Sequence, residues 1–280
     1  MSENLILLDI DHTVITKYIN IMGLKNLQKI IQNLQQSSRF DVGLCSDRPY
    51  GELKIFQNIL GTNGPLIGEM GGTFNGIPTW PNEYLLQIIQ AQIELGPALI
   101  GFARVSPCQL TFGYNSVDYD KNLNNLTGPD SVYSGDHIYM DISRKCCLAV
   151  GFRSIHNGKR EDTKHMVDEC KKIIQAIAIK HGLTPENTFM FSDDNDWGVI
   201  LVHFAEAGKY RVTPRLLKDY AEIFMIGDTT FDDLKGDERV VQMAVGNAET
   251  SYKDICSFVA NYEYGFGVSE CLLQIQKLTS

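Results

Sequence analysis

Apolar and polar positions along the chain recur with two different periods, one typical of strands and one typical of helices. Residues 4–10 form a short, mostly apolar run, which predicts a buried strand. Over residues 24–34 the apolar positions return every three or four residues, which predicts one face of an amphipathic helix. A second strand is expected at residues 41–44 and a second helix at residues 52–60. Strand, helix, strand is the pattern of a parallel βαβ unit, whose functional groups lie at the carboxyl ends of the strands.

The stretch from about Pro78 to about Phe204 has a different character. The segment that leads into it, "GPLIGEMGGTFNGIP", contains glycines and prolines that punctuate structure rather than extend it, so we place a domain boundary there. Within the stretch we expect strands at residues 109–114, 138–142 and 147–152, and a long amphipathic helix at residues 163–180. "TFMF" and "GVILVHF" flank the polar turn "SDDNDW" as the two arms of a hairpin do.

Beyond Lys209 the alternating pattern returns. A helix is expected at residues 214–220 and a strand at residues 223–226, followed by "VVQMAVGNA", a further helix and "FVA". The simplest topology is an α/β fold in which both ends of the chain form one parallel sheet. We therefore expect a core domain of residues 1–76 and 206–280, with residues 77–205 inserted as a second α/β domain.

Length, charge and cysteine usage limit the class of protein. The 280 residues suffice for one large domain or two smaller ones. The net charge of −9 and the absence of a Lys/Arg-rich run argue against nucleic acid or an anionic membrane as partner, whereas a cation suits the acidic clusters. The sequence contains neither about 18 consecutive apolar residues nor a secretion signal, so we expect a cytoplasmic protein. Seven scattered cysteines without C-x-x-C suggest neither a disulfide framework nor a zinc site.

Two carboxylates end the first predicted strand, in the sequence "DIDHT". Asp9 and Asp11 point to the same side if the strand stays extended, because side chains alternate with a period of two. Two like charges at that separation are costly unless a cation lies between them or one of them is protonated. The pair therefore predicts a metal site, general acid/base chemistry, or both.

A second acidic cluster follows the strand "EIFMIG" and contains Asp228, Asp232 and Asp233. In a parallel sheet this cluster opens onto the same edge as Asp9 and Asp11. Carboxylate oxygens at this density favour Mg²⁺, and the small number of histidines argues against zinc.

The order of "DIDHT", "CSDRP", a lysine and "GDTTFDD" resembles the haloacid dehalogenase superfamily, whose members are mostly phosphohydrolases. The resemblance covers residues 4–75 and 205–275. "GEMGGTFNG", "MIGDTTFDD", "AVGNAETSYKDICSFVA" and "YGFGVSECL" look like the Cof-type and sucrose-phosphatase-like branch. That branch implies a Rossmann-like core with a large α+β cap domain that selects the substrate.

The resemblance implies a role for each motif residue. Asp9 is the nucleophile that forms an aspartyl-phosphate, which splits one difficult displacement into two easier ones. Asp11 protonates the leaving alkoxide and then deprotonates the hydrolytic water, a task best served by a pKa close to neutrality. Ser46 donates a hydrogen bond to a phosphoryl oxygen. Asp228 ligates Mg²⁺ together with the Asp9 carboxylate and the Asp11 backbone carbonyl, and Asp232 supports either the shell of the metal or the lysine.

Three positions fit the resemblance less well. Lys209 and Lys218 both precede the last motif, and we favour Lys209 as the lysine that offsets charge on the nucleophile and phosphate. His12 occupies a position where the family usually has glycine, which indicates a loop residue or, alternatively, a group that faces the substrate. Phe231 replaces the asparagine that is typical of the Cof branch. These changes leave the catalytic groups in place.

Three further polar residues are candidates for substrate binding. Thr13 either contacts substrate or satisfies the loop backbone. Arg48 either reaches a phosphate or sugar oxygen or forms a surface ion pair. Asn247, in "AVGNA", either closes the site from below or caps a turn.

We therefore expect a Mg²⁺-dependent phosphatase for a small phosphorylated metabolite, such as a sugar phosphate or a phosphoglycolate-like acid, acting as a monomer or homodimer. A phosphomutase of the same superfamily, similar to phosphomannomutase, would use the same aspartates but return the phosphoryl group to its substrate. Response-regulator receivers also combine a phosphorylatable Asp with a Ser/Thr and a lysine, but they are much shorter and need no second aspartate. A catalytically silent binding protein has no use for a complete set of acids.

Overall fold

The apolar run near the N-terminus forms strand β1 (Asn4–Leu8), all five residues of which are buried. β1 lies between β2 (Phe40–Cys45) and β12 (Glu222–Gly227) and pairs with both in parallel. A strand that is covered on both faces carries no polar alternation, which explains the nearly continuous apolar sequence.

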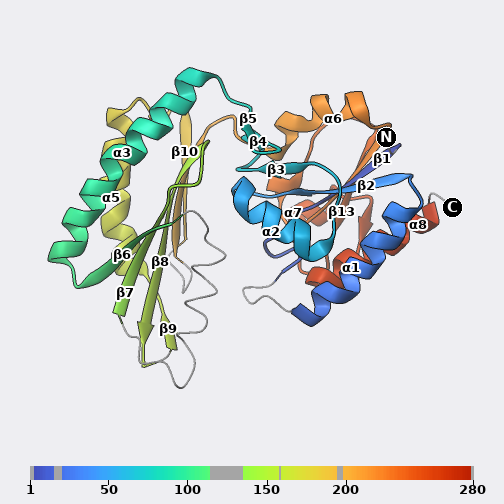
Figure 1. Cartoon of the computed structure of the whole chain (residues 1–280), viewed down its shortest axis with the longest axis horizontal. Coiled ribbons are helices and arrows are strands. Elements are labelled where there is room, and N and C mark those ends of the chain that lie inside the picture. The colour runs from blue at the N-terminus through green and yellow to red at the C-terminus, as the bar shows by residue number, and fades with distance from the viewer. Residues whose placement is uncertain (1–2, 16–20, 114–134, 158, 194–197, 279–280) are drawn as a thin grey trace. The chain divides into compact units, whose positions relative to one another are not determined.

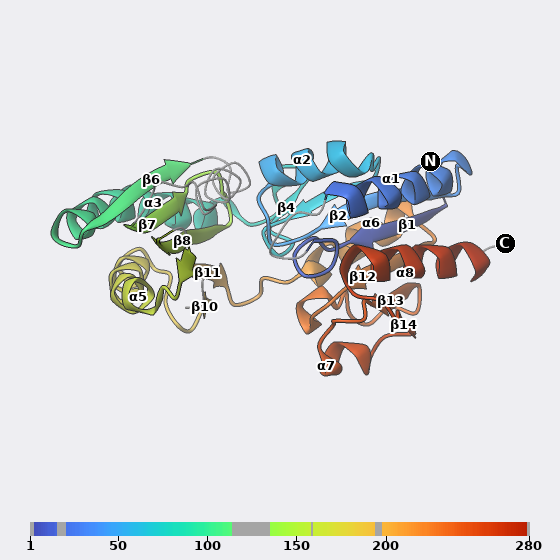
Figure 2. The same cartoon turned by 90° about the horizontal axis from the view of Figure 1, so that it is seen from below.

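The computed structural model describes residues 3–15, 21–113, 135–157, 159–193 and 198–278. The chain forms two compact units. The core unit comprises Met1–Thr79 and Ala207–Ser280, and the inserted unit comprises Trp80–Glu206. Each unit is a sheet with helices packed against it (Figures 1 and 2).

The core unit contains one eight-stranded sheet in the order β14-β13-β12-β1-β2-β3-β4-β5. The strands from β14 to β3 are parallel, and β4 and β5 are antiparallel to their neighbours. Both ends of the chain therefore contribute to one sheet, which confirms the predicted α/β fold. The remaining strands of this sheet are β3 (Leu66–Gly68), β4 (Thr73–Phe74), β5 (Ile77–Pro78), β13 (Val240–Ala244) and β14 (Phe258–Val259).

Helices cover both faces of the core sheet. Figure 1 shows α1, α2 and α8 along one face and α6 along the other. On the α6 face, Leu5 and Leu7 of β1 form a buried apolar cluster with Ile223 and Met225 of β12 and Leu216 of α6. The helical segments of the core are α1 (Ile21–Gln36), α2 (Tyr50–Leu60), the 3₁₀ helix η1 (Lys209–Val212), α6 (Thr213–Asp219), the 3₁₀ helix η2 (Thr230–Asp232), α7 (Thr250–Lys253) and α8 (Tyr264–Leu278).

The inserted unit contains a second sheet in the order β10-β11-β8-β7-β6, with the short β9 paired to β8. The β10–β11 pair is the predicted hairpin. β6 and β7 pair in parallel, unlike the antiparallel neighbours in the rest of this sheet. Helices α3 (Asn82–Val105) and α5 (Lys164–Lys180) pack against each other and against the sheet. The strands are β6 (Cys108–Gly113), β7 (Gly135–Asp141), β8 (Cys147–His156), β9 (Lys159–Glu161), β10 (Thr188–Asp193) and β11 (Val199–Phe204).

Two helices escaped the pattern analysis, each for an identifiable reason. α3 has apolar residues on more than one side, including the exposed Leu86 and Ile93, and Pro97 lies inside it. By length and composition alone α3 could cross a bilayer, a criterion that core helices of soluble proteins also meet. α8 begins with the glycine-containing sequence "YGFG", which weakens the helical signal.

The glycine-rich segment before the inserted unit also differs from the expectation. Instead of only punctuating the chain, it adds β3, β4 and β5 to the core sheet. The turns between these strands are tight because Gly71 and Gly76 both have a φ of 77°, which glycine adopts without steric cost.

We predict that Gly43 of β2 tolerates no side chain. A Cβ atom there would lie 2.4 Å from the carbonyl oxygen of Pro65, which itself accepts a hydrogen bond from Leu44. Gly43→Ala should therefore lower the free energy of unfolding by about 1–3 kcal/mol, measured by urea denaturation. Gly51→Ala is the matched control, because Gly51 lies in helix α2 with no atom within 4 Å of the added carbon, and helix propensity favours alanine. Equal stability of Gly43→Ala and the native chain would contradict this packing.

Candidate active site

The polar residues that end three neighbouring strands converge at one edge of the core sheet. Asp9 follows β1, Ser46 follows β2 and Asp228 follows β12. β1 pairs in parallel with both of the other strands, so the three carboxyl ends lie side by side. The chain runs outward from β1 to β2 and β3 on one side and to β12, β13 and β14 on the other. Open α/β sheets bind their ligands at such a reversal of strand order.

A buried lysine joins two of the acids at this edge. Lys209 is the first residue of η1 and is only 3% exposed. Its Nζ lies 2.5 Å from Asp9 Oδ1 and also donates to Asp232 Oδ1. The structure therefore brings Lys209 to the predicted nucleophile.

The second oxygen of Asp232 shapes the loop that carries Asp228. Asp232 Oδ2 accepts hydrogen bonds from the backbone N–H groups of Asp228 at 2.8 Å and Thr229 at 3.1 Å. Asp228 Oδ1 in turn accepts a hydrogen bond from the buried Thr13 hydroxyl at 3.0 Å. A side chain at Gly227 would collide with Asp232, because its Cβ would lie 2.2 Å from Oδ2.

Three carboxylates crowd together around this lysine. Oxygens of Asp9, Asp228 and Asp232 lie within 4.8 Å of one another. Burial raises the pKa of Asp228 to about 7, and the neighbouring Asp232 adds to the rise. Burial also raises the pKa of Asp9, against the opposing charge of Lys209. For Lys209 burial acts in the other direction, but Asp232 and Asp9 outweigh it and raise its pKa, so the ammonium stays charged.

Asp11 has a different cationic partner from Asp9. β1 ends at Leu8, so the predicted strand over residues 4–10 is two residues too long, and Asp11 lies in the turn that follows. Its two carboxylate oxygens accept hydrogen bonds from Arg48 Nε at 2.8 Å and Nη2 at 2.6 Å. Arg48 Nη1 donates to the buried Glu52 at 2.6 Å.

The surroundings of Asp11 do not move its pKa toward neutrality, the range that would best serve the acid/base task. Burial acts to raise the pKa of Asp11, but the Arg48 guanidinium outweighs burial and lowers it. The arginine stabilises the ionised form through its charge and through two hydrogen bonds to that form.

Ser46 and Asn247 are held by the backbone around the site. Ser46 is buried, and its hydroxyl oxygen accepts a 3.4 Å hydrogen bond from the Arg48 N–H. Asn247 Nδ2 donates to the carbonyl oxygen of His12 at 2.7 Å, and its Oδ1 accepts from the N–H of Tyr264, the first residue of α8. Asn247 therefore connects the "DIDHT" turn to the start of α8 through hydrogen bonds. Of its two predicted roles, this corresponds to capping a turn.

Other residues lie away from the carboxylate group. Asp233 turns toward the Lys235 N–H and Gln242 Nε2, so it does not join the other acids of its cluster. His12 is exposed with a φ of 59°, which accounts for a position where glycine is usual. Phe231 is also exposed.

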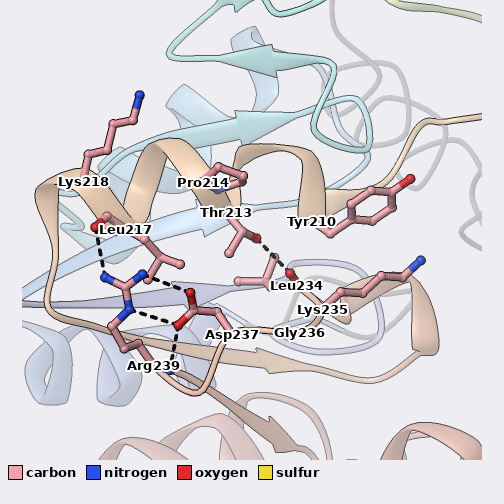
Figure 3. A pocket seen from close by; sticks show the side chains of 10 residues that line it. All are labelled: Tyr210, Thr213, Pro214, Leu217, Lys218, Leu234, Lys235, Gly236, Asp237 and Arg239. Carbon is pink, nitrogen blue, oxygen red and sulfur yellow. Dashed lines mark hydrogen bonds and ion pairs between the residues drawn. The ribbon is translucent and has the colours of Figure 1, made fainter.

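Lys218, the other candidate lysine, lies at a pocket of the core unit and not beside Asp9. Lys218 of α6 lines a pocket of about 510 Å³, together with Tyr210, Lys235 and Arg239. In Figure 3 its side chain extends away from the other labelled residues. The structure thus places Lys209, and not Lys218, beside Asp9.

Glu52 is the residue at this edge that sequence reasoning missed. It lies four positions after Arg48, in the first turn of α2, and is fully buried. The i, i+4 spacing of opposite charges was the available signal.

No protein-family model matches the sequence, and no curated protein matches it. Solved structures do match. A haloacid dehalogenase-like hydrolase from Bacteroides thetaiotaomicron is similar with a TM-score of 0.57 at 15% identity, over 98% of this chain and 100% of that chain. A trehalose-6-phosphate phosphatase related protein has a TM-score of 0.53 at 17% identity, over 98% of both chains. The sucrose-phosphatase from Synechocystis, solved with sucrose and phosphate, has a TM-score of 0.50 at 10% identity, over 99% of both chains.

These similarities extend over nearly the whole chain and include both units. At identities of 10–17% they concern the fold, not the reaction. The motif order predicted the same group of proteins. The chain has the fold of the haloacid dehalogenase-like hydrolases.

Proposed function

We propose that this chain is a Mg²⁺-dependent phosphatase that hydrolyses a small phosphorylated metabolite through an aspartyl-phosphate. The observation that carries the proposal is the buried Lys209, which contacts Asp9 and Asp232 where β1 and β12 end. An ammonium in this place favours the ionised Asp9 and offsets the charge of a bound phosphoryl group. The structural neighbours include phosphatases, which supports the reaction class.

The carboxylate group suits a divalent cation. When all three carboxylates are ionised, they leave two negative charges beyond the one ammonium in a buried place, and a divalent cation would compensate them. All the side-chain donors are oxygens, as Mg²⁺ prefers. We assign Asp9, Asp228, the Asp11 backbone carbonyl and, in support, Asp232 to this ion. When bound, Mg²⁺ would supply positive charge to the phosphoryl oxygens.

The proposed reaction has two steps, formation of the aspartyl-phosphate and its hydrolysis. In the first, an Asp9 oxygen forms a bond to phosphorus, the ester P–O bond breaks, and Asp11 gives its proton to the leaving alkoxide. In the second, Asp11 takes a proton from water, the water oxygen bonds to phosphorus, and the bond to Asp9 breaks. Ser46 donates to a phosphoryl oxygen, and Lys209 stabilises the charge on it. Arg48 lowers the pKa of Asp11 and so favours its ionised form, which is the form that takes the proton from water in the second step; in the first step Asp11 must carry a proton.

We propose a sugar phosphate or a phosphoglycolate-like acid as the substrate, with the inserted unit choosing the leaving group. The first class is supported by two structural neighbours, a sucrose-phosphatase and a protein related to trehalose-6-phosphate phosphatase. Thr13 and Asn247 support the loops of the site in this proposal. In this proposal the enzyme is cytoplasmic, is monomeric or homodimeric, and acts without nucleic acid or membrane; the net charge of −9 supports the last of these points.

Phosphate release from a panel of small phosphomonoesters, with and without Mg²⁺, tests the function. We expect Mg²⁺-dependent release, and a loss of roughly 10⁴-fold or more in kcat for Asp9→Asn, because the amide is not a nucleophile. Full activity of Asp9→Asn would exclude the assigned nucleophile. Conversion of the substrate to an isomer without free phosphate would indicate the phosphomutase instead.

The two candidate lysines are distinguished by one pair of variants. Lys209→Met removes the ammonium from Asp9, and we expect kcat to fall by about 10²–10³-fold. Lys218→Met removes the same charge from α6 and should leave kcat unchanged. Thermal unfolding of both variants shows whether they are folded. A greater loss in Lys218→Met would contradict the site described here.

The raised pKa of Asp228 predicts a pH-dependent response to Mg²⁺. A carboxyl whose pKa rises from about 4 to about 7 on folding takes up a proton, so metal-free protein should lose stability as the pH rises across this range. Mg²⁺ favours the ionised form, so its increase in Tm should be larger at pH 8 than at pH 6. At 100 times the Kd this stabilisation is about 2.7 kcal/mol.

Asp228→Asn provides the matched test of that response. The variant should be more stable than native protein without metal at pH 8, because it removes a repelling charge, and it should lose the Tm increase with Mg²⁺. Asp233→Asn is the control, since Asp233 bonds elsewhere, and it should keep the response. An undiminished Mg²⁺ response in Asp228→Asn would rule out Asp228 as a ligand.

A further inference from the structure

Glu52 is a fully buried carboxylate that takes no part in the proposed reaction. It lies in the first turn of α2, and its Oε2 accepts a 2.6 Å hydrogen bond from Arg48 Nη1. Burial of an ionised carboxylate is costly unless a partner of opposite charge compensates it. The hydrogen bond to Glu52 therefore fixes the position of the Nη1 edge of the Arg48 guanidinium.

The opposite edge of Arg48 holds Asp11. Nε donates to Asp11 Oδ2 at 2.8 Å and Nη2 donates to Oδ1 at 2.6 Å. Two parallel hydrogen bonds to the two oxygens define the plane of a carboxylate, as a single bond does not. The guanidinium also lies over the ring of Phe56, 5.3 Å from its centroid. Because the guanidinium is planar and rigid, its contacts with Glu52 and Phe56 determine where its Asp11 edge points.

We propose that Glu52 is a positioning residue that acts through Arg48 to aim the Asp11 carboxylate at the leaving-group oxygen. This inference rests on the proposed phosphatase function. The Asp11 side chain is 45% exposed although Arg48 holds it, so an oxygen of the substrate can still reach it. Arg48 thus orients the acid/base through both Asp11 oxygens, while its Nη1 contacts Glu52.

Leaving-group dependence separates positioning of Asp11 from a general structural role. The value of kcat/KM reports the reaction through cleavage of the ester bond, the step in which Asp11 gives up its proton. An alkoxide needs this proton, whereas p-nitrophenolate is a stable anion and leaves without it. General acid catalysis contributes about 10²–10⁴-fold when the leaving group requires it.

The test compares Glu52→Gln with the native chain on two esters. The esters are p-nitrophenyl phosphate and the alkyl phosphate that the native chain hydrolyses fastest. We expect kcat/KM for the alkyl ester to fall at least about tenfold, and that for the aryl ester to change less than about threefold. An equal loss for both esters, or no loss for either, would overturn the inference.

Arg239→Gln is the matched control. It breaks another arginine–carboxylate pair of the core unit, in which Arg239 Nε and Nη2 each lie 2.9 Å from an oxygen of Asp237. We expect no change for either ester in this variant. A selective loss for the alkyl ester in Arg239→Gln would also count against a specific role for Glu52.

Failure of the proposed function has a different signature. If the native chain hydrolyses neither ester, the phosphatase proposal fails, and a crystal structure of Glu52→Gln then decides the positioning by itself. Loss of the two contacts between Arg48 and Asp11 would support it. Retention of both contacts in their present geometry would overturn it.

Discussion

One buried ammonium compensates part of the negative charge of the carboxylates at the edge of the core sheet. Lys209 lies between Asp9 and Asp232, and Asp228 is close to both acids. Without the lysine, three carboxylates would repel one another in a place that water hardly reaches. With the lysine present, the fully ionised group still carries two excess negative charges, which favours binding of a divalent cation. The proposed chemistry depends on this imbalance, because the excess negative charge would attract a divalent cation, and that cation together with Lys209 would offset the negative charge of a phosphoryl group.

The sheet supplies the geometry for this arrangement. Three parallel strands end together, so Asp9, Ser46 and Asp228 arrive at one edge without long loops. Asp232 then uses its second oxygen to fix the turn that carries Asp228. A separate network of Arg48 and Glu52 holds Asp11, so the two aspartates of "DIDHT" have different partners. This division keeps one acid beside an ammonium while the other faces outward.

The pattern of apolar residues was sufficient to predict a parallel sheet with functional groups at the carboxyl ends of its strands, because continuous apolar runs that alternate with amphipathic helices are typical of βαβ units. Contacts between segments far apart in the sequence were not predictable in the same way. The partner of Asp11 depends on how α2 packs, and the turning away of Asp233 depends on the η2 turn. Helix α3 was missed because its apolar residues do not form a single stripe.

The proposed reaction requires that Asp9 becomes phosphorylated during turnover, and direct detection of that bond is its most decisive test. The reaction would be quenched with acid during steady-state turnover in Mg²⁺, treated with borohydride to reduce any aspartyl-phosphate, and analysed by mass spectrometry of the peptide that contains "LLDIDHT". We expect reduction at Asp9, dependent on both substrate and Mg²⁺. Reduction at a different residue, or phosphate release with no trace of a modified Asp9, would contradict it.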